Sequence, residues 1–363
     1  MPFIMQPASV LTKFPSVCGP FLRASKRRRD RKERDMKAFE YYRASNTKEA
    51  VAILSQYGEK AAILAGGSDL LSIMKDGIGG PKFNLPQHLI DIKECGDLKS
   101  IKEAKGVLRI GAAVTISEIV SSSLIKEKCP LLGQTASQIA VPQIRNVGTI
   151  GGNLCQRPRC WYFRGRLFKD CFRKGGDYCY APGGENQYHA IVGGGKCFMV
   201  YPSDMAVALL ALKARLEVSG SKGRRIVPLE RFYVSPNKNV LRENVLSPQE
   251  MVTTVEIPLD SSAKGVFLKL KERQAFDFAV VNVAINVAFK GTKIAEGRIV
   301  FGGVAPYPYR DLKAELALKG RSIAEARAEA VRSSLAEAEP LSGNAYKVTA
   351  AKGLLEKAIS TLT

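Results

Sequence analysis

Apolar and polar residues alternate in short blocks over the first quarter of the chain. Compact apolar runs, which are typical of strands, lie at residues 39–42, 61–65 and 89–92. Helical spacing of apolar residues follows Ser45-Asn46, a pair suited to cap a helix, and residues 69–74 have the length of a second short helix. The order strand, helix, strand, helix, strand predicts a small α/β subdomain.

A second block mixes strands and helices. Two short apolar runs on either side of Lys105-Gly106 predict a hairpin, and Thr115-Ile-Ser-Glu118 has the pattern of a capping box that opens a helix. Apolar spacing predicts a helix over residues 130–140, stopped by Pro142, and another helix that starts at Asp204. Further strands are predicted at residues 214–218, 224–228 and 252–257.

The C-terminal part is patterned differently. Three apolar runs between residues 266 and 301 predict a meander of strands, and roughly the last 50 residues are rich in Ala, Leu, Glu and Lys with helical spacing. These patterns predict an α+β fold, in which a two-lobed domain precedes a C-terminal α+β domain with a small antiparallel sheet and helices. The predicted parts are residues 1–35, a disordered basic extension or a mis-assigned start; residues 36–92; residues 93–246, with a long loop at 155–197; and residues 247–363.

Charge and hydropathy exclude some classes of protein. The 363 residues carry a formal net charge of +21, but no nucleic-acid motif accompanies it, so we predict no nucleic-acid partner. No run of about 18 apolar residues is present, which predicts no membrane span. Residues 1–35 lack the apolar segment and cleavage site of a signal peptide, so we expect a cytoplasmic protein, unless a partner's signal exports an assembled complex.

Two glycine-rich turns are candidates for binding phosphate. Leu64-Ala-Gly-Gly-Ser-Asp-Leu70 follows a predicted strand, and its glycines allow successive backbone N–H groups to face one anion. Ser68 adds a hydroxyl donor, whereas Asp69 could cap the next helix instead. Thr149-Ile-Gly-Gly-Asn153 is a second turn of the same character, whose asparagine can donate to a phosphate. Two such turns could hold both phosphates of one dinucleotide, although a glycine pair after a strand is commonly only a turn.

Five of the eight cysteines lie directly after the second turn, with the spacing C-x4-C-x10-C-x7-C-x17-C from Cys155 to Cys197. The close C-x2-C pairs of zinc ribbons are absent, but four thiolates from one long loop suit an iron–sulfur cluster. Because Cys155 follows the glycine turn so closely, its backbone is committed to that turn. The preferred metal ligands are Cys160, Cys171, Cys179 and Cys197. The alternatives are an irregular loop with unlinked thiols and a zinc-binding module for nucleic acid.

Catalytic side chains are not recognisable in the sequence. His88 and His189 are the only histidines, and neither has a serine or aspartate partner in a hydrolase-like order. A stand-alone oxidase would need a base near its cofactor, and no candidate is found. We therefore predict no catalytic acid, base or nucleophile.

Taken together, the two glycine turns, Pro202-Ser-Asp204 and Arg273-Gln-Ala-Phe-Asp-Phe-Ala279 resemble the FAD-binding medium subunit of the xanthine dehydrogenase family of molybdenum hydroxylases. The resemblance covers roughly residue 36 to the C-terminus and implies a two-lobed FAD-binding domain of the vanillyl-alcohol-oxidase-like type. Cys155-Gln-Arg-Pro-Arg-Cys160 resembles the branch whose flavin subunit carries an extra [4Fe-4S] loop. That branch includes aldehyde oxidoreductase flavin subunits and the 4-hydroxybenzoyl-CoA reductase β subunit, and the x10 gap is closer to the aldehyde oxidoreductase form.

The resemblance implies roles for the matched positions. Asp204 would bind the ribityl or adenosine side of FAD, Leu246 would pack near the isoalloxazine ring, and Lys269 would approach that ring. The residues implied to hold the FAD pyrophosphate are Leu64, Ala65, Gly66, Gly67, Ser68, Asp69 and Leu70, together with Thr149, Ile150, Gly151, Gly152 and Asn153. Implied partners are a large molybdenum-cofactor subunit and a small [2Fe-2S] subunit, which pass electrons through FAD to NAD, oxygen or a ferredoxin. The [4Fe-4S] cluster would be an accessory redox centre.

Overall fold

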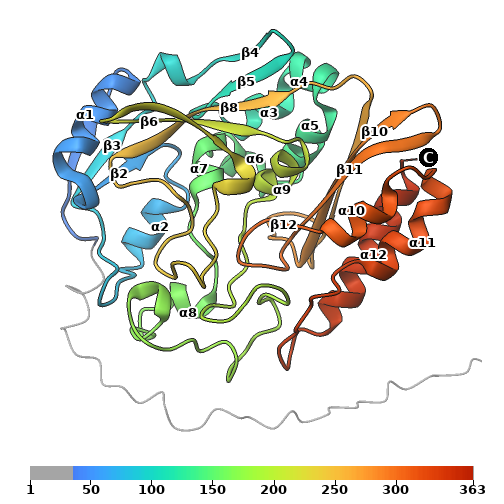
Figure 1. Cartoon of the computed structure of the whole chain (residues 1–363). Coiled ribbons are helices and arrows are strands. Elements are labelled where there is room, and N and C mark those ends of the chain that lie inside the picture. The colour runs from blue at the N-terminus through green and yellow to red at the C-terminus, as the bar shows by residue number, and fades with distance from the viewer. Residues whose placement is uncertain (1–35, 363) are drawn as a thin grey trace, which may run out of the picture. The chain divides into compact units, whose positions relative to one another are not determined.

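A computed structural model describes residues 36–362, which contain three β-sheets (Figure 1). The predicted basic extension over residues 1–35, with Cys18, lies outside the described residues. The first sheet is parallel, in the order β1-β3-β2, from β1 (Glu40–Arg43), β2 (Ala61–Leu64) and β3 (His88–Asp91). Two helices complete this subdomain: α1 (Thr47–Tyr57) and α2 (Leu70–Lys75).

The first subdomain follows the predicted order of elements. Asn46 caps α1, because its side-chain oxygen accepts from the Glu49 amide at 3.0 Å. Adjacent residues of β3 serve two small cores, since Ile90 is buried in a cluster with Leu54 of α1, while Leu89 is buried with Met74 of α2. The two helices therefore bury opposite faces of the central strand, as the side-chain period of a strand requires.

The second sheet is antiparallel, in the order β4-β5-β8-β6-β7. Its strands are β4 (Ile101–Ala104), β5 (Val107–Gly111), β6 (Arg215–Gly220), β7 (Gly223–Pro228) and β8 (Glu250–Pro258). The predicted domain boundary at residue 247 places β8 with the C-terminal sheet. That placement is wrong for β8, which pairs with β5 and β6. Strand patterns alone do not say which sheet a strand joins.

Short helices and 3-10 turns occupy the connections between the strands of the first two sheets and the loop of residues 155–197. They are α3 (Ile116–Ser121), α4 (Ser123–Lys128), α5 (Pro130–Ser137), α6 (Pro142–Arg145), α7 (Ile150–Cys155), α8 (Trp161–Arg164) and α9 (Asp204–Ala211), with 3-10 turns η2 (Gly58–Lys60), η3 (Gly96–Leu98), η4 (Phe172–Lys174) and η5 (Leu229–Arg231). Both hydrogen bonds of the predicted capping box at Thr115 and Glu118 are present. Pro142 does not merely stop a helix, because it opens α6 at a position where its missing N–H costs nothing.

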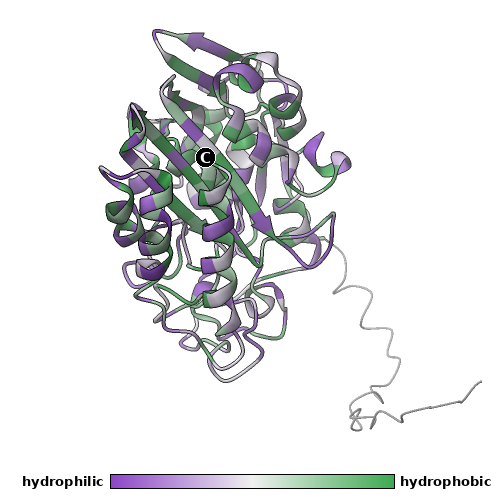
Figure 2. Ribbon diagram, turned by 90° about the vertical axis from the view of Figure 1, so that its right-hand side faces the viewer, coloured by the Kyte–Doolittle hydropathy of each residue, from purple (hydrophilic) through white to green (hydrophobic). Residues whose placement is uncertain are grey.

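The third sheet is antiparallel, in the order β12-β11-β10-β9. It comprises β9 (Ala263–Leu270), β10 (Val281–Lys290), β11 (Lys293–Gly302) and β12 (Tyr309–Arg310), and α10 (Leu312–Leu318), α11 (Ile323–Ser333) and α12 (Tyr346–Ser360) follow. Val283 and Ile285 of β10 are buried with residues of these helices, whereas Ala284 belongs to the core that contains α9. Figure 2 looks toward the C-terminal helices and shows largely hydrophobic strands behind them. Both faces of the sheet are thus covered.

The architecture confirms the predicted α+β class, with a C-terminal domain made of a small antiparallel sheet and helices. Most predicted strands lie within a few residues of their observed positions. Among residues 36–362, no helix is long and apolar enough to cross a membrane.

The burial of β10 leads to a prediction on stability. Ile285→Ala, at a fully buried site, should lower the free energy of unfolding by about 2–5 kcal/mol, because it leaves a cavity between the sheet and its helices. Ile226→Ala is the matched control, since this β7 side chain is 49% exposed and should change stability far less. Urea unfolding followed by circular dichroism measures both, and equal losses would contradict the assigned core.

Candidate functional site

A cavity of about 750 Å³ brings together residues from all three sheets and their connecting loops. Cavities of this size are typical of sites for cofactors and other large ligands. The predicted cofactor residues that line it are Ala65, Gly66, Gly67, Ser68, Asp69, Leu70, Thr149, Gly151, Gly152, Asn153, Asp204, Leu246 and Lys269. Leu64 and Ile150 do not line it. Their side chains are buried in hydrophobic cores, so the structure gives them a packing role.

The two glycine turns meet in space, which sequence alone could not decide. A Cβ atom added at Gly66 would lie 1.9 Å from the carbonyl oxygen of Val147, in the segment that leads into the second turn. A Cβ atom at Gly152 would lie 4.0 Å from that of Ala65. Gly67 has φ of +72°, a conformation that glycine adopts without strain. Close backbone contact therefore requires glycine at these places.

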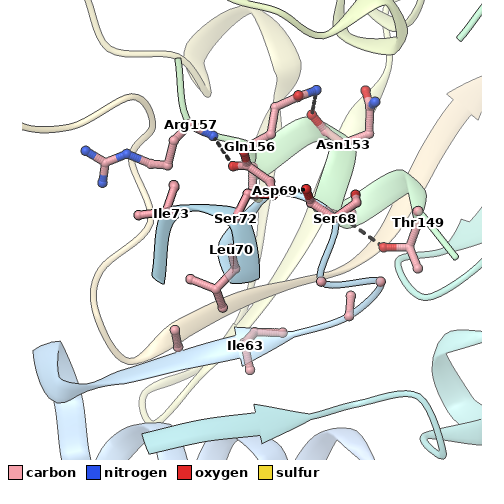
Figure 3. A pocket seen from close by; sticks show the side chains of 18 of the residues that line it. Ile63, Ser68, Asp69, Leu70, Ser72, Ile73, Thr149, Asn153, Gln156 and Arg157 are labelled. Atoms are coloured by element: carbon pink, nitrogen blue, oxygen red, sulfur yellow. Dashed lines mark hydrogen bonds between the residues drawn. The ribbon is translucent and has the colours of Figure 1, made fainter. Parts of the chain in front are cut away.

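The first turn presents free donors to the cavity. The backbone N–H groups of residues 66–69 have no hydrogen-bond acceptor within the described part of the chain. Such a run of unpaired amides along a tight turn suits an anionic oxygen. Ser68, in the same turn, has its side chain among those that line the pocket in Figure 3. Phosphate binding by the Leu64–Leu70 turn stays a prediction, and these free amides supply the donors that it needs.

The second turn differs from its prediction. Its residues form the short helix α7, and the amides of Ile150, Gly151, Gly152 and Asn153 are all used inside the protein. Its remaining donors are side chains. Asn153 Oδ1 accepts from the Ser203 hydroxyl at 2.5 Å, which leaves the Asn153 amino group to donate. The second turn thus offers side-chain donors, whereas the first turn offers backbone N–H donors.

Asp69 does not cap α2 with its side chain, contrary to one prediction. Its carboxylate instead accepts from the backbone N–H of Arg157 at 2.8 Å (Figure 3). The same carboxylate lies 2.6 Å from an Arg164 nitrogen and 2.9 Å from an Arg159 nitrogen. All three arginines belong to the cysteine loop of residues 155–197. Asp69 therefore ties the first glycine turn to that loop.

Asp204 and Lys269 form a buried ion pair beside the cavity. The Lys269 ammonium lies 2.7 Å from Asp204 Oδ2 and also donates to the Asp277 and Gln138 carbonyl oxygens. Asn282 donates to the other oxygen of Asp204. Because Asp204 is on α9 and Lys269 on β9, this pair joins the two domains on one side of the cavity.

Sequence reasoning missed several cavity residues. Arg157 and Arg159 line the cavity, although both lie outside the two glycine turns. Phe276 and Phe278 also line it, and the Arg159 guanidinium lies 5.1 Å from the ring centre of Phe278. The conspicuous segment Arg273–Ala279 was the available signal for the two aromatic residues.

The cysteine loop folds into short turns that begin at cysteines. Cys160 precedes α8 and Cys171 precedes η4. The Cys160 sulfur lies 3.3 Å from His189 Nε2. Burial raises the pKa of the Cys160, Cys171 and Cys179 thiols, and neighbouring backbone amides partly lower it again.

Four cysteines interact with one another and the fifth does not. Cys160, Cys171 and Cys179 each interact electrostatically with Cys197, and Cys171 does so with Cys160 and Cys179. Burial alone raises the pKa of the Cys155 thiol, to about 12, and its interactions are with Tyr201 and Tyr233. The four cysteines preferred from the sequence therefore act on one another electrostatically, and their role as metal ligands stays a prediction. Among residues 36–362, no group of His, Cys, Asp or Glu is arranged to hold a single metal ion.

Two family models match almost the whole described chain. The model of the FAD binding domain in molybdopterin dehydrogenase matches residues 37–260, and that of the CO dehydrogenase flavoprotein C-terminal domain matches residues 266–362. The chain belongs to this family of FAD-binding medium subunits. The resemblance found in the sequence is confirmed, and the alternative of a zinc-binding nucleic-acid module is set aside.

Relatives of this flavoprotein subunit are parts of oxidoreductases. The aldehyde oxidoreductase FAD-binding subunit PaoB of Escherichia coli K12 is 34% identical, over 90% of this chain and 98% of PaoB. The carbon monoxide dehydrogenase medium chain of Hydrogenophaga pseudoflava is 28% identical, over 89% of this chain and 96% of that protein. A solved structure of the Hydrogenophaga pseudoflava enzyme matches with a TM-score of 0.70, at 28% identity, over 90% of this chain and 97% of that one. The predicted class, a subunit of an oxidoreductase, is confirmed.

The close approach at Gly66 leads to a test of the FAD site. Gly66→Ala should push the two turns apart and lower FAD affinity at least about tenfold, a loss of ~1.4 kcal/mol. Gly96→Ala is the matched control, because a Cβ atom at Gly96 meets nothing within 4 Å. The flavin-to-protein ratio and a flavin titration measure the effect. Wild-type affinity in Gly66→Ala would contradict the placement of this turn.

Proposed function

We propose that this chain is the electron-transfer subunit of a molybdenum hydroxylase. Electrons from a molybdenum subunit and a [2Fe-2S] subunit pass through FAD held here to an external acceptor such as NAD, oxygen or a ferredoxin. A [4Fe-4S] cluster held by Cys160, Cys171, Cys179 and Cys197 is an accessory redox centre. The observation that carries the proposal is that Asp69, in the FAD turn, binds three arginines of the cysteine loop.

The residues of the cavity fit FAD. The unpaired amides of residues 66–69 suit the pyrophosphate oxygens, and the Asn153 amino group lies on the facing turn. Leu246 adds an apolar wall, while the Asp204–Lys269 pair keeps two opposite charges together beside the cofactor. FAD supplies electron transfer when bound, and the protein binds and orients it. No catalytic acid, base or nucleophile is needed for this role.

The cysteine quartet fits a cluster better than a single ion. A cubane cluster separates its four thiolates by several bonds, so the sulfur atoms lie farther apart than the ligands of one metal ion. The four cysteines interact with one another across the loop without forming a site for a single ion. The backbone amides that lower the pKa of the Cys160, Cys171 and Cys179 thiols would stabilise thiolates.

The descriptions of the relatives support the proposed partner subunits and the aldehyde oxidoreductase branch of the family. Several are described as medium chains or FAD-binding subunits, names that belong to multi-subunit enzymes, and one similar solved structure is described as a Cu,Mo-CO dehydrogenase. The 34% identity to an aldehyde oxidoreductase subunit favours that branch over a 4-hydroxybenzoyl-CoA reductase. The substrate is set by the molybdenum subunit and not by this chain.

Replacing single cysteines tests the cluster. Anaerobically purified protein should contain about four irons per chain, because one cubane cluster uses the quartet. Cys171→Ser should lose most of this iron and keep most of the FAD, whereas Cys155→Ser, five residues from the nearest ligand, should keep both. Iron and flavin analyses on the same samples measure this. Iron near zero in the wild type, or an equal loss in both variants, would contradict the quartet.

The proposed path of electrons from the partner subunits through FAD leads to a second prediction. Tagged chain isolated from its native host should bring with it a molybdenum-containing subunit and a [2Fe-2S] subunit, detected by metal analysis and electron paramagnetic resonance (EPR). In the Gly66→Ala complex, an aldehyde substrate should still reduce the [2Fe-2S] centres, but electron delivery to the acceptor should fall with FAD content. Isolation of the chain alone and free of molybdenum, or delivery independent of FAD, would contradict the proposed role.

A further inference from the structure

Arg173 is a fully buried cation inside the cysteine loop. Its guanidinium lies 2.8 Å from Glu243 Oε1, and its side chain has no exposed surface. It also interacts electrostatically with the thiols of Cys197 and Cys171. A buried charge is retained at a large cost in desolvation, so its partners matter.

The hydrogen bonds of Arg173 are incomplete. Its Nε and Nη2 atoms are buried and make no hydrogen bond of normal geometry with the described residues, although the Cys197 thiol lies close enough to act on the guanidinium. Buried donors without acceptors are rare in folded proteins and indicate a missing partner. Sulfur atoms of a cluster on Cys171 and Cys197 would provide acceptors at this place, since both thiols already interact with the guanidinium.

Glu243 connects Arg173 to the FAD cavity. Its second oxygen lies 3.1 Å from Arg157 Nε, and Arg157 lines the cavity. The Arg157 guanidinium lies 4.7 Å from the ring centre of Phe83 and 5.3 Å from that of Phe163. One buried carboxylate thus lies between two arginines, one beside the cysteines and one beside the flavin site. Together, Arg157, Glu243 and Arg173 carry a net positive charge, because two cations share one carboxylate.

Other charges face the same region. Lys174 is buried and interacts with Cys171 and Cys160, and its ammonium donates to the carbonyl oxygens of Gly165 and Phe168. Asp69 acts on Arg157 from the glycine turn. Among these charged groups, only Arg173 both contacts Glu243 through its side chain and interacts with two of the four cysteines.

These charges have a direct consequence for electron transfer. Each electron that a cluster accepts adds one negative charge, so a nearby buried cation stabilises the reduced form and a nearby anion destabilises it. Because the group is shielded from solvent, ions in the medium screen these interactions only weakly. Arg173 would therefore stabilise the reduced form of the cluster, and Glu243 would destabilise it.

We propose that Arg173 and Glu243 are positioning residues that set the reduction potential of the [4Fe-4S] cluster in opposite directions. Arg173 raises the potential through its charge and its hydrogen bonds to sulfur, and Glu243 lowers it. The pair thereby adjusts the cluster relative to the flavin on the other side of Arg157. This inference rests on the cluster of the proposed function.

The test is a redox titration of the cluster by EPR, on the intact complex, for the wild type and three variants. Arg173→Met should lower the potential and Glu243→Gln should raise it. At a fixed potential, Arg173→Met and Glu243→Gln should each change the ratio of reduced to oxidised cluster about tenfold. This change corresponds to a shift of about 59 mV in the reduction potential of a one-electron couple. Arg173→Lys keeps the charge and should lie between Arg173→Met and the wild type. Lys169→Met, an exposed site in the same loop, is the control and should cause a much smaller shift.

The outcomes separate this inference from the proposed function. If the wild type contains no iron, the cluster itself is wrong and the inference falls with it. If all proteins contain about four irons and the potentials of Arg173→Met and Glu243→Gln stay unchanged or move in the same direction, only the inference is overturned. If Arg173→Met loses its cluster, Arg173→Lys and Glu243→Gln still decide, because an unchanged potential in Glu243→Gln overturns the opposing role.

Discussion

The carboxylate of Asp69 is the contact on which the arrangement of this site depends. It lies in the first glycine turn and binds the backbone of Arg157 and the side chains of Arg159 and Arg164. A long irregular loop has little regular structure to hold it in place. Charged hydrogen bonds to one partly buried carboxylate give it a defined position. The phosphate-binding turn and the cysteine loop are therefore held together.

Buried charge is distributed in a few linked groups. Asp204 and Lys269 join the two domains beside the cavity, while Glu243 lies between Arg157 and Arg173. Each of these five side chains has an opposite charge within hydrogen-bond distance, as burial requires. Arg173, beside the cysteines, and Arg157, beside the cavity, each keep two buried donors that make no hydrogen bond of normal geometry with the described residues. In the proposed electron-transfer role, these fixed charges would lie beside the redox centres.

The two glycine turns show how similar motifs acquire different roles. Both have the sequence character of a phosphate loop. The first keeps its amides unpaired, whereas the second forms α7 and uses its amides internally. Gly151 of the second turn serves close packing, because a Cβ atom there would lie 2.8 Å from Ala112 Cβ. The second turn thus contributes Thr149 and Asn153 side chains and a tight contact with the first.

Local pattern in the sequence determined the elements of this protein, their order and the family, because capping boxes, strand alternation and glycine turns depend on neighbouring residues. It also predicted a set of four cysteines apart from Cys155, and these four act on one another electrostatically in the structure. Only the tertiary structure decided that β8 joins the second sheet, that Leu64 and Ile150 face cores, and that Asp69 binds arginines instead of capping α2. These outcomes depend on contacts between residues far apart in the chain, such as Asp69 and Arg164, and one sequence carries no record of such contacts.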